Sequence, residues 1–351
     1  MRLDNDRTGH AAETRLFRTE PDRPMEMLRK CPAYEATPLG PMPALAGELG
    51  IGSLAVKDET RRMRLGSFKA LGGVFAVAQM IADVAGTAVL TGEKARETAT
   101  AMTFITASAG NHGLSVAAGA RIFGAQGIIV LGSSVPEGFA DRIRNAGAEV
   151  MRVNGSYENS VRQAMEAAEE NGWLLLADGS WDGYTERPAL VMEGYTVLAE
   201  ECRQAFEKTG DWPTHVFLQA GVGGLAAAVA GHIRAHWAGQ PRIVVVEPEA
   251  APCLLKSVEA GELTRAGGPA SNMGRLDCKD ASLIAFEALR HDVDMFVTVT
   301  DEEAAEAAGL YARHGIATTP SGAAPLAALA QMKPGPDARC MLIATEGPEQ
   351  S

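Results

Sequence analysis

The chain has 351 residues, a formal net charge of −12 at pH 7, 46% hydrophobic residues and 22% charged residues. Such a length and composition suit one large α/β domain or two smaller ones, and they exclude an intrinsically disordered chain. An acidic balance repels phosphate backbones, so we expect no nucleic-acid partner.

The five cysteines are widely spaced, and no two of them form a Cys-x-x-Cys pair. This favours reduced thiols in the cytoplasm over a disulfide framework. No apolar run approaches the length of a membrane span, and the polar start of the chain is not typical of a secretory signal. We therefore expect a cytoplasmic protein with no membrane partner and no metal in its site.

The first hundred residues predict few regular elements. Residues 1–36 are polar, with weak periodicity, and are expected to form an irregular arm. A short strand is expected at 54–56, and a helical pattern runs from Ser67 through Met80. Residues 83–103 are rich in Ala, Thr and Gly and are expected to be a linker or an insertion.

From residue 104 onward, strand-like and helix-like segments alternate. Strands are expected at 104–106, 127–131, 149–153, 173–177, 214–219, 243–246, 295–299 and 340–344. Helices are expected at 136–146, 156–171 and 189–209. An Ala-rich helix is expected to end near Phe123, and another to begin at Leu225. This alternation favours a parallel sheet with helices on both faces.

The first chemical motif is Ser67-Phe68-Lys69, at a predicted helix start. Burial lowers the pKa of a lysine, and a neutral amine can attack an aldehyde, so Lys69 is a candidate nucleophile. A surface lysine whose stem lies along apolar neighbours would give the same three residues.

The second motif is the run from Ser108 through Ala109, Gly110, Asn111 and His112 to Gly113, between a predicted strand and a predicted helix. Free N–H groups at a helix start bind anions such as a carboxylate, and glycine lets a ligand come close. Asn111 could also donate a hydrogen bond to a ring hydroxyl. An Asn-centred turn capped by a serine is the structural alternative.

The third motif is Gly221-Val222-Gly223-Gly224-Leu225, between a predicted strand and an Ala-rich helix. A glycine loop in this place can cradle a phosphate with its backbone donors. It lacks the third glycine of the dinucleotide fingerprint and the Gly-Lys-Ser/Thr of a nucleotide P-loop. Glu247 has the spacing of a ribose-binding acid, so spacing alone does not exclude a nicotinamide dehydrogenase. A tight strand-to-helix turn is the structural alternative.

An amine, a carboxylate cradle and a phosphate cradle are what an amino acid joined to pyridoxal phosphate (PLP) requires. With these motifs the sequence resembles the fold-type II PLP enzymes, the superfamily of the tryptophan synthase β chain. Within that superfamily it is similar to the diaminopropionate ammonia-lyases. Further segments carry this resemblance: Val56–Glu59, Phe68–Gly73, Trp181–Tyr184, Thr214–Gly223, Val246–Glu249 and Thr345–Gly347.

The resemblance implies two open, mostly parallel α/β sheets in a large and a small domain, with the active site between them. The large, PLP-binding domain would comprise 1–94 and 189–351, and the small domain 95–188. Homodimers are usual in the family, so a homodimer is expected.

The resemblance also assigns roles to residues. Lys69 would hold the aldehyde carbon of PLP and act in catalysis, Asn111 would contact the ring oxygen, and Thr345 the pyridine nitrogen. The phosphate would bind Gly221, Val222, Gly223, Gly224 and Leu225. The substrate would contact Ser108, Ala109, Gly110, Asn111, His112 and Asp182.

The expected reaction is α,β-elimination from a small, diaminopropionate-like L-amino acid, giving a 2-oxo acid and ammonia. Dehydration of serine, threonine or 3-hydroxyaspartate, and β-replacement by a synthase, are alternatives, as is a protein that only binds an amino acid. Asp182 and Glu59 are candidate acids for the leaving group.

Two features depart from the family pattern or stand outside it. The lyases carry an acid, the base toward D-substrates, where this chain has Ala109, so we expect Lys69 alone to take the α-proton and D-amino acids to react poorly. Arg61, Arg62 and Arg64 are either a solvated turn or a site for an acidic substrate side chain.

Overall fold

The computed structural model describes residues 1–7, 15–155 and 157–348. By their internal contacts, these residues divide into two compact units. The larger unit contains Met1–Pro21, Ala33–Phe68 and Gly179–Gln350, and the smaller one contains Asp22–Pro32 and Lys69–Asp178.

The larger unit is built on a seven-stranded sheet whose five central strands are parallel. In spatial order the strands are β1 (Arg2–Asp4), β10 (Met295–Val299), β9 (Arg242–Pro248), β8 (His215–Gln219), β11 (Arg339–Ala344), β3 (Ser53–Asp58) and β2 (Leu39–Pro41). The edge strands β1 and β2 are antiparallel to their neighbours. Strands β9, β10 and β11 are almost continuously apolar because helices bury both faces of the sheet.

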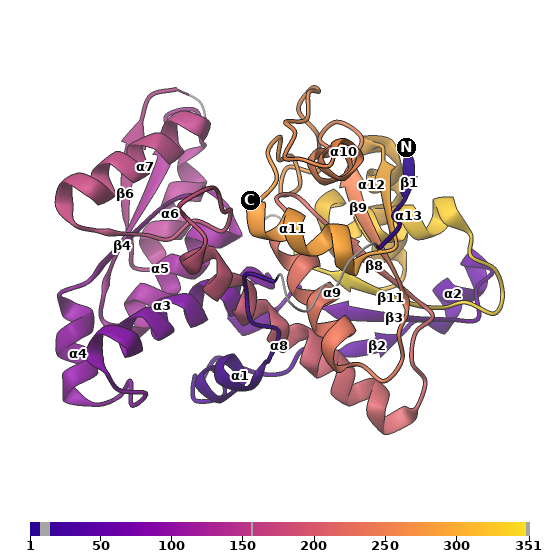
Figure 1. The fold of residues 1–351 in the computed structure, drawn as a ribbon, viewed down its shortest axis with the longest axis horizontal. Coiled ribbons are helices and arrows are strands. Elements are labelled where there is room, and N and C mark those ends of the chain that lie inside the picture. The colour runs from indigo at the N-terminus through magenta and orange to yellow at the C-terminus, as the bar shows by residue number, and fades with distance from the viewer. Residues whose placement is uncertain (8–14, 156, 349–351) are drawn as a thin grey trace. The chain divides into compact units, whose positions relative to one another are not determined.

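Helices cover this sheet on its two faces (Figure 1). One face carries α8 (Glu186–Thr209), α9 (Gly224–His236) and α11 (Leu283–Asp292), and the other carries α12 (Asp301–Arg313) and α13 (Pro320–Met332). Shorter helices are α2 (Pro43–Leu49), the 3-10 turn η2 (Arg62–Arg64) and α10 (Cys253–Ala260). The main core lies on the side of the sheet that α12 and α13 cover. The small Ala and Gly residues of α13 let this helix approach the strands closely.

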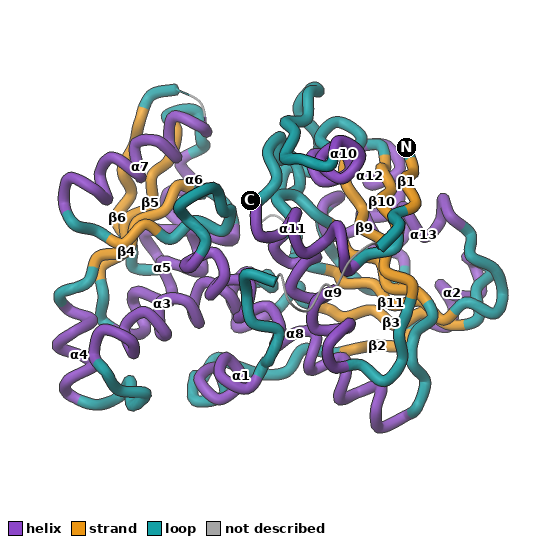
Figure 2. Tube along the Cα trace, viewed as in Figure 1, coloured by secondary structure: helices purple, strands orange, loops and turns teal. Residues whose placement is uncertain are grey.

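The smaller unit has a four-stranded parallel sheet, shown with its helices in Figure 2. Its strand order is β6 (Glu149–Val153), β5 (Gln126–Gly132), β4 (Thr103–Ala107) and β7 (Leu174–Leu175). Its helices are α1 (Asp22–Leu28), α3 (Lys69–Ala85), α4 (Glu93–Thr100), α5 (Asn111–Phe123), α6 (Glu137–Asn145) and α7 (Tyr157–Asn171).

Helix α3 packs closely on α5 because glycines lie at their contact. A Cβ atom at Gly73 would lie 2.0 Å from the Ser115 hydroxyl oxygen, and one at Gly119 would lie 3.2 Å from the Val74 Cα. The position of Gly73 therefore requires glycine for the two helices to approach so closely, and a side chain at Gly119 would be tightly packed. This packing places α3, and with it Lys69, in the smaller unit.

The predicted α/β class with two mostly parallel sheets is confirmed. One local expectation is wrong, because the arm at 1–36 contains β1 and α1. The segment at 83–103, expected to be a linker or an insertion, contains α4. Residues 8–14 of that arm, and Ser156 of the expected helix 156–171, lie outside the described residues. No helix among the described residues is long and apolar enough to span a membrane.

The two units differ in extent from the domains expected from sequence. Helix α3 and residues 22–32, expected in the large domain, belong to the smaller unit. Residues 179–188, expected in the small domain, belong to the larger unit. The cause is the packing of α3 on α5 and of α1 on α3, which links segments far apart in sequence.

Candidate active site

Lys69 is the first residue of α3, and its ammonium forms an ion pair with the Asp178 carboxylate. Asp178 comes shortly after β7, beyond the carboxyl end of that strand. Burial alone would raise the pKa of Asp178, but the Lys69 ammonium lowers it, so the pKa lies below the ordinary carboxyl value. The Lys69 ammonium thus has an ionised carboxylate directly beside it.

His112 lies near this ion pair, in the first turn of α5. Its Nε2 lies 2.7 Å from the carbonyl oxygen of Leu176, which can only accept, so Nε2 carries the proton. Burial lowers the pKa of His112, and the ring is neutral as a result. Its Nδ1 is buried and has no hydrogen-bond partner among the described residues, which leaves an acceptor near Lys69 and Asp178.

The loop before α5 has the geometry of an anion cradle. Gly110 is the N-cap of the helix, and no side-chain cap is present at this helix start, which suits an anion. A Cβ atom at Gly113 would lie 2.1 Å from the carbonyl oxygen of Ser108, so only glycine lets the loop fold back on the helix. Ser108 and Ala109 complete this turn and are partly exposed.

The glycine loop of the larger unit lies between β8 and α9. Gly223 is the N-cap of α9 with φ +101°, a backbone conformation that disfavours other residues, and no side chain caps the helix. A Cβ atom at Gly221 would lie 2.9 Å from the Cys278 sulfur. The loop is therefore compact, and the first N–H groups of α9 are suited to binding a phosphate.

The loop borders a pocket of about 310 Å³ within the larger unit. Val222 contributes to its lining together with Ser180, Trp181 and Arg265.

Thr345 follows β11, the strand beside β8, so it lies at the same edge of the sheet as the glycine loop. Its hydroxyl oxygen is 3.1 Å from Nε2 of Gln219, the last residue of β8. The carbonyl of Thr345 accepts a 3.1 Å hydrogen bond from the N–H of Phe68. The backbone of Phe68 is thereby fixed to Thr345 within the larger unit.

The larger unit also contains a buried ionic network formed by Lys57, Glu59, Arg62 and Glu201. Arg62 is fully buried and donates hydrogen bonds to the carboxylates of Glu59 and Glu201, while Lys57 pairs with Glu201 at 2.6 Å. Burial alone would lower the pKa of Arg62, but Glu59 and Glu201 raise it above its ordinary value. Met63, which follows Arg62, has φ 49°, so the network holds a strained turn.

This network corrects two interpretations of the sequence. Arg62 is neither solvated nor available to a substrate, whereas Arg61 and Arg64 are exposed. Glu59 is fully buried and accepts from Arg62 and Thr37, which is unsuited to an acid that must reach a leaving group.

Two further acidic residues that the sequence singled out lie in different settings. Asp182 is exposed, in a turn between Trp181 and Tyr184, whose rings stack at 4.4 Å. Glu247 is fully buried and accepts 2.8 Å hydrogen bonds from the N–H groups of Leu254 and Leu255. It stabilises the start of α10 and is not placed to bind a ribose.

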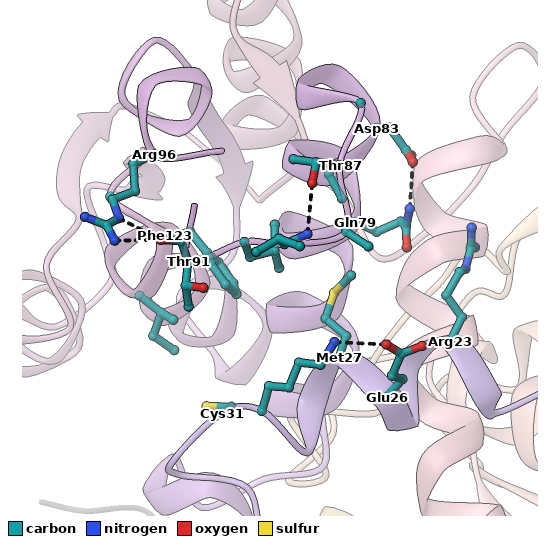
Figure 3. A pocket seen from close by; sticks show the side chains of 18 of the residues that line it. Arg23, Glu26, Met27, Cys31, Gln79, Asp83, Thr87, Thr91, Arg96 and Phe123 are labelled. Carbon is teal, nitrogen blue, oxygen red and sulfur yellow. Dashed lines mark hydrogen bonds and ion pairs between the residues drawn. The ribbon is translucent and has the colours of Figure 1, made fainter. Parts of the chain in front are cut away.

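A larger pocket, with a volume of about 1100 Å³, lies within the smaller unit against α1, α3, α4 and the end of α5 (Figure 3). Most of its polar side chains are already paired, as in the contacts of Lys30 with Glu26 and of Gln79 with Asp83. None of the predicted site residues lines it. Size therefore does not mark the chemical site in this protein.

Two residues of the site were not predicted from the sequence. Asp178 follows the apolar run 173–177, and a carboxylate just beyond a parallel strand is a signal that was available. Gln219 ends the strand before the glycine loop, but its bond to Thr345 joins residues 126 positions apart, and no local pattern indicates it.

Both units thus present features of enzymes that use a phosphorylated aldehyde. The lysine is paired with a carboxylate, and the glycine loop precedes a helix without a side-chain cap and has little room for a Cβ at Gly221 or Gly223. A lysine amine can hold the aldehyde carbon of PLP and a glycine loop can bind its phosphate, so each unit carries groups that suit this coenzyme.

Comparison with known proteins agrees with this fit. The family model described as pyridoxal-phosphate dependent enzyme matches residues 31–346, so the chain belongs to this family and uses PLP. Diaminopropionate ammonia-lyase of Escherichia coli strain K12 is 34% identical over 289 residues, which are 79% of this chain and 71% of that protein. The enzyme of that name from Salmonella typhimurium is 36% identical over 287 residues, 78% of this chain and 70% of the relative.

A solved structure is similar over nearly the whole chain. It is the crystal structure of the E. coli diaminopropionate ammonia-lyase in complex with an aminoacrylate-PLP azomethine reaction intermediate. The TM-score is 0.87 at 30% identity, and the match covers 99% of this chain and 93% of that one. The predicted fold type II is confirmed by this likeness.

Proposed function

We propose that this protein is an ammonia-lyase that carries out α,β-elimination on a small L-amino acid, with L-2,3-diaminopropionate as its substrate. The observation that carries the proposal is the pairing of Lys69 with Asp178. An amine whose conjugate acid is stabilised by a neighbouring carboxylate suits a reaction that moves one proton off carbon and onto a leaving group. The diaminopropionate ammonia-lyases among the relatives support the choice of substrate.

Bound PLP supplies an aldehyde that takes up the substrate amine and a ring that spreads the electrons of the broken Cα–H bond. Lys69 takes the Cα proton as general base. The resulting ammonium is stabilised by Asp178 and can protonate the β-amino group, which leaves as ammonia. Hydrolysis of the released 2-aminoacrylate gives the 2-oxo acid and a second ammonia.

The loop before α5 orients the substrate. The N–H groups from Ala109 to His112 would bind its carboxylate, and Asn111 would contact the ring oxygen of PLP. A fixed carboxylate keeps the Cα–H bond aligned for proton removal. The buried, neutral ring of His112 supports the loop through its bond to Leu176. Asp182 is exposed and is a candidate substrate contact.

The glycine loop from Gly221 to Leu225 would hold the phosphate. Its uncapped helix start and positive φ at Gly223 support this role. Asp178 is better placed than Asp182 or Glu59 to assist the leaving group, because it already contacts the lysine that takes the proton.

A substrate panel tests the proposal. Ammonia and 2-oxo acid release would be measured with L-2,3-diaminopropionate, L-serine, L-threonine and L-threo-3-hydroxyaspartate. We expect the diamino acid to be the best substrate, and Lys69→Ala to abolish turnover while the exposed-lysine control Lys30→Ala does not. A higher kcat/KM for a hydroxyamino acid would assign a dehydratase instead. Turnover only with an added nucleophile would assign a synthase, and binding without turnover a non-catalytic protein.

We also propose that the protein acts in the cytoplasm as a homodimer in amino-acid catabolism. Five cysteines, none of them in a disulfide, support a reducing compartment. Sedimentation of the purified holoenzyme would give its mass, and a monomer at micromolar concentration would contradict the proposed dimer.

A further inference from the structure

Gln219 holds a position that the proposed reaction does not use. It is only 2% exposed, at the end of β8, two residues before Gly221 of the glycine loop. Its Nε2 lies near three acceptors: the carbonyl oxygen of Ile343 at 3.0 Å, the hydroxyl of Thr345 at 3.1 Å and the carbonyl oxygen of Gly322 at 3.4 Å. One amide group therefore joins β8, β11 and α13.

The surroundings fix the orientation of this amide. Two of its neighbours are backbone carbonyls, which can only accept hydrogen bonds, so the NH2 side of the amide must face them. The reverse orientation would bring the amide oxygen against those carbonyl oxygens. The observed orientation leaves Oε1 of Gln219 buried without a hydrogen-bond partner among the described residues. In this orientation the amide NH2 group donates hydrogen bonds, whereas the amide oxygen accepts none from the described residues.

The direction of the Thr345 hydroxyl follows from this orientation. Its oxygen accepts from Gln219, so its own proton must be donated elsewhere. A hydroxyl that must donate matches an unprotonated pyridine nitrogen, which has a lone pair and no proton. A protonated ring nitrogen would leave the buried hydroxyl proton without an acceptor, which is unfavourable.

We infer that Gln219 is a positioning residue that orients the Thr345 hydroxyl as a donor to the pyridine nitrogen and so keeps the ring of PLP unprotonated. The inference builds on the proposed contact of Thr345 with the cofactor. An unprotonated ring withdraws electrons less strongly, which favours elimination over reactions that need a stronger electron sink.

A double-mutant cycle on cofactor binding tests this inference without relying on turnover. Apo forms of the wild type, Gln219→Leu, Thr345→Val and the double variant would be titrated with PLP by equilibrium dialysis. We expect each single substitution to weaken PLP binding about tenfold, equivalent to about 1.4 kcal/mol. The double variant should bind no more weakly than Thr345→Val, because Gln219 acts through the hydroxyl.

A structural role for Gln219 predicts a different pattern. Its loss would then weaken PLP binding equally with and without the Thr345 hydroxyl, and this additivity would overturn the inference, as would unaltered binding by Gln219→Leu. The thermal unfolding of the apo forms reports the separate cost of the unpaired carbonyls. Gln219→Met, with an unbranched side chain, replaces the leucine variant if that one does not fold.

A second readout is the visible absorption of the bound cofactor measured against pH. We expect Gln219→Leu and Thr345→Val to change its pH dependence in the same direction, and opposite changes would count against the inference. Failure of the proposed function would look different: the wild type would bind PLP and show the cycle, yet release no ammonia. If Thr345→Val binds PLP as the wild type does, the assignment of Thr345 is wrong and the inference falls with it.

Discussion

Replacing the buried Arg62 with methionine should destabilise the protein strongly. The five N–H donors of Arg62 face six acceptor oxygens: four in the carboxylates of Glu59 and Glu201, the carbonyl oxygen of Glu35 and the Thr37 hydroxyl. Its removal leaves two buried carboxylates with Lys57 as the remaining cation of the network. Breaking a buried ion pair typically costs about 3–5 kcal/mol, and we expect a loss in that range.

The stability cost of Arg62→Met should depend on pH, and the shifted pKa of Glu201 gives the direction. Burial would raise the pKa of Glu201, but Arg62 and Lys57 lower it below its ordinary value. The contribution of the network is therefore present above the ordinary carboxyl pKa of about 4.3 and lost as the pH falls through the lowered value. We expect Arg62→Met to cost most near neutral pH and progressively less as the pH falls below about 4.

Urea unfolding followed by circular dichroism measures this cost, and the exposed neighbour Arg61 provides the control. We expect Arg61→Met to change the free energy of unfolding by no more than about 0.5 kcal/mol. Equal losses for the two substitutions, or a loss below about 1 kcal/mol for Arg62→Met, would refute the interpretation of the network as a structural anchor.

Three further predictions concern the site. Asp178→Asn should lower kcat by about 100-fold or more while PLP still binds, since the lysine loses its ionised partner; kinetics with an unchanged kcat would contradict its role. Ala109→Asp should increase turnover of D-2,3-diaminopropionate relative to the L-isomer, and an unchanged ratio in a chiral assay would show that the position does not set stereospecificity. Gly223→Ala should weaken PLP binding in a dialysis titration and destabilise the protein by about 1–3 kcal/mol, because φ +101° disfavours alanine and its Cβ would lie 3.0 Å from two side chains; unaltered binding would exclude the loop as the phosphate cradle.

The sequence predicted the main elements well because the central strands are long apolar runs and the helices between them are regular. Elements whose cause is non-local were missed. Strand β1 has three residues and exists because it pairs with β10, nearly 300 positions away in the chain. Helix α4 has only eight residues, too few to be stable alone, and burial of Ala95 and Ala99 in the smaller unit stabilises it.

The candidate site was predicted in part for the same reason. The glycine loop and the Lys69 motif are short local signals that follow strands or begin helices. The pairing of Lys69 with Asp178 and the bond from Gln219 to Thr345 depend on which strands become neighbours. Arg62 was misinterpreted because three closely spaced arginines indicate a solvated surface, whereas the backbone turns one of them into the core.

The attachment of the coenzyme to one lysine is the central claim. Borohydride reduction of the holoenzyme would fix the lysine-bound coenzyme covalently, and peptide mass mapping would locate it. The account predicts a phosphopyridoxyl group on the peptide that contains Lys69 and on no other lysine peptide. Modification of a different lysine, with the Lys69 peptide unmodified, would contradict it.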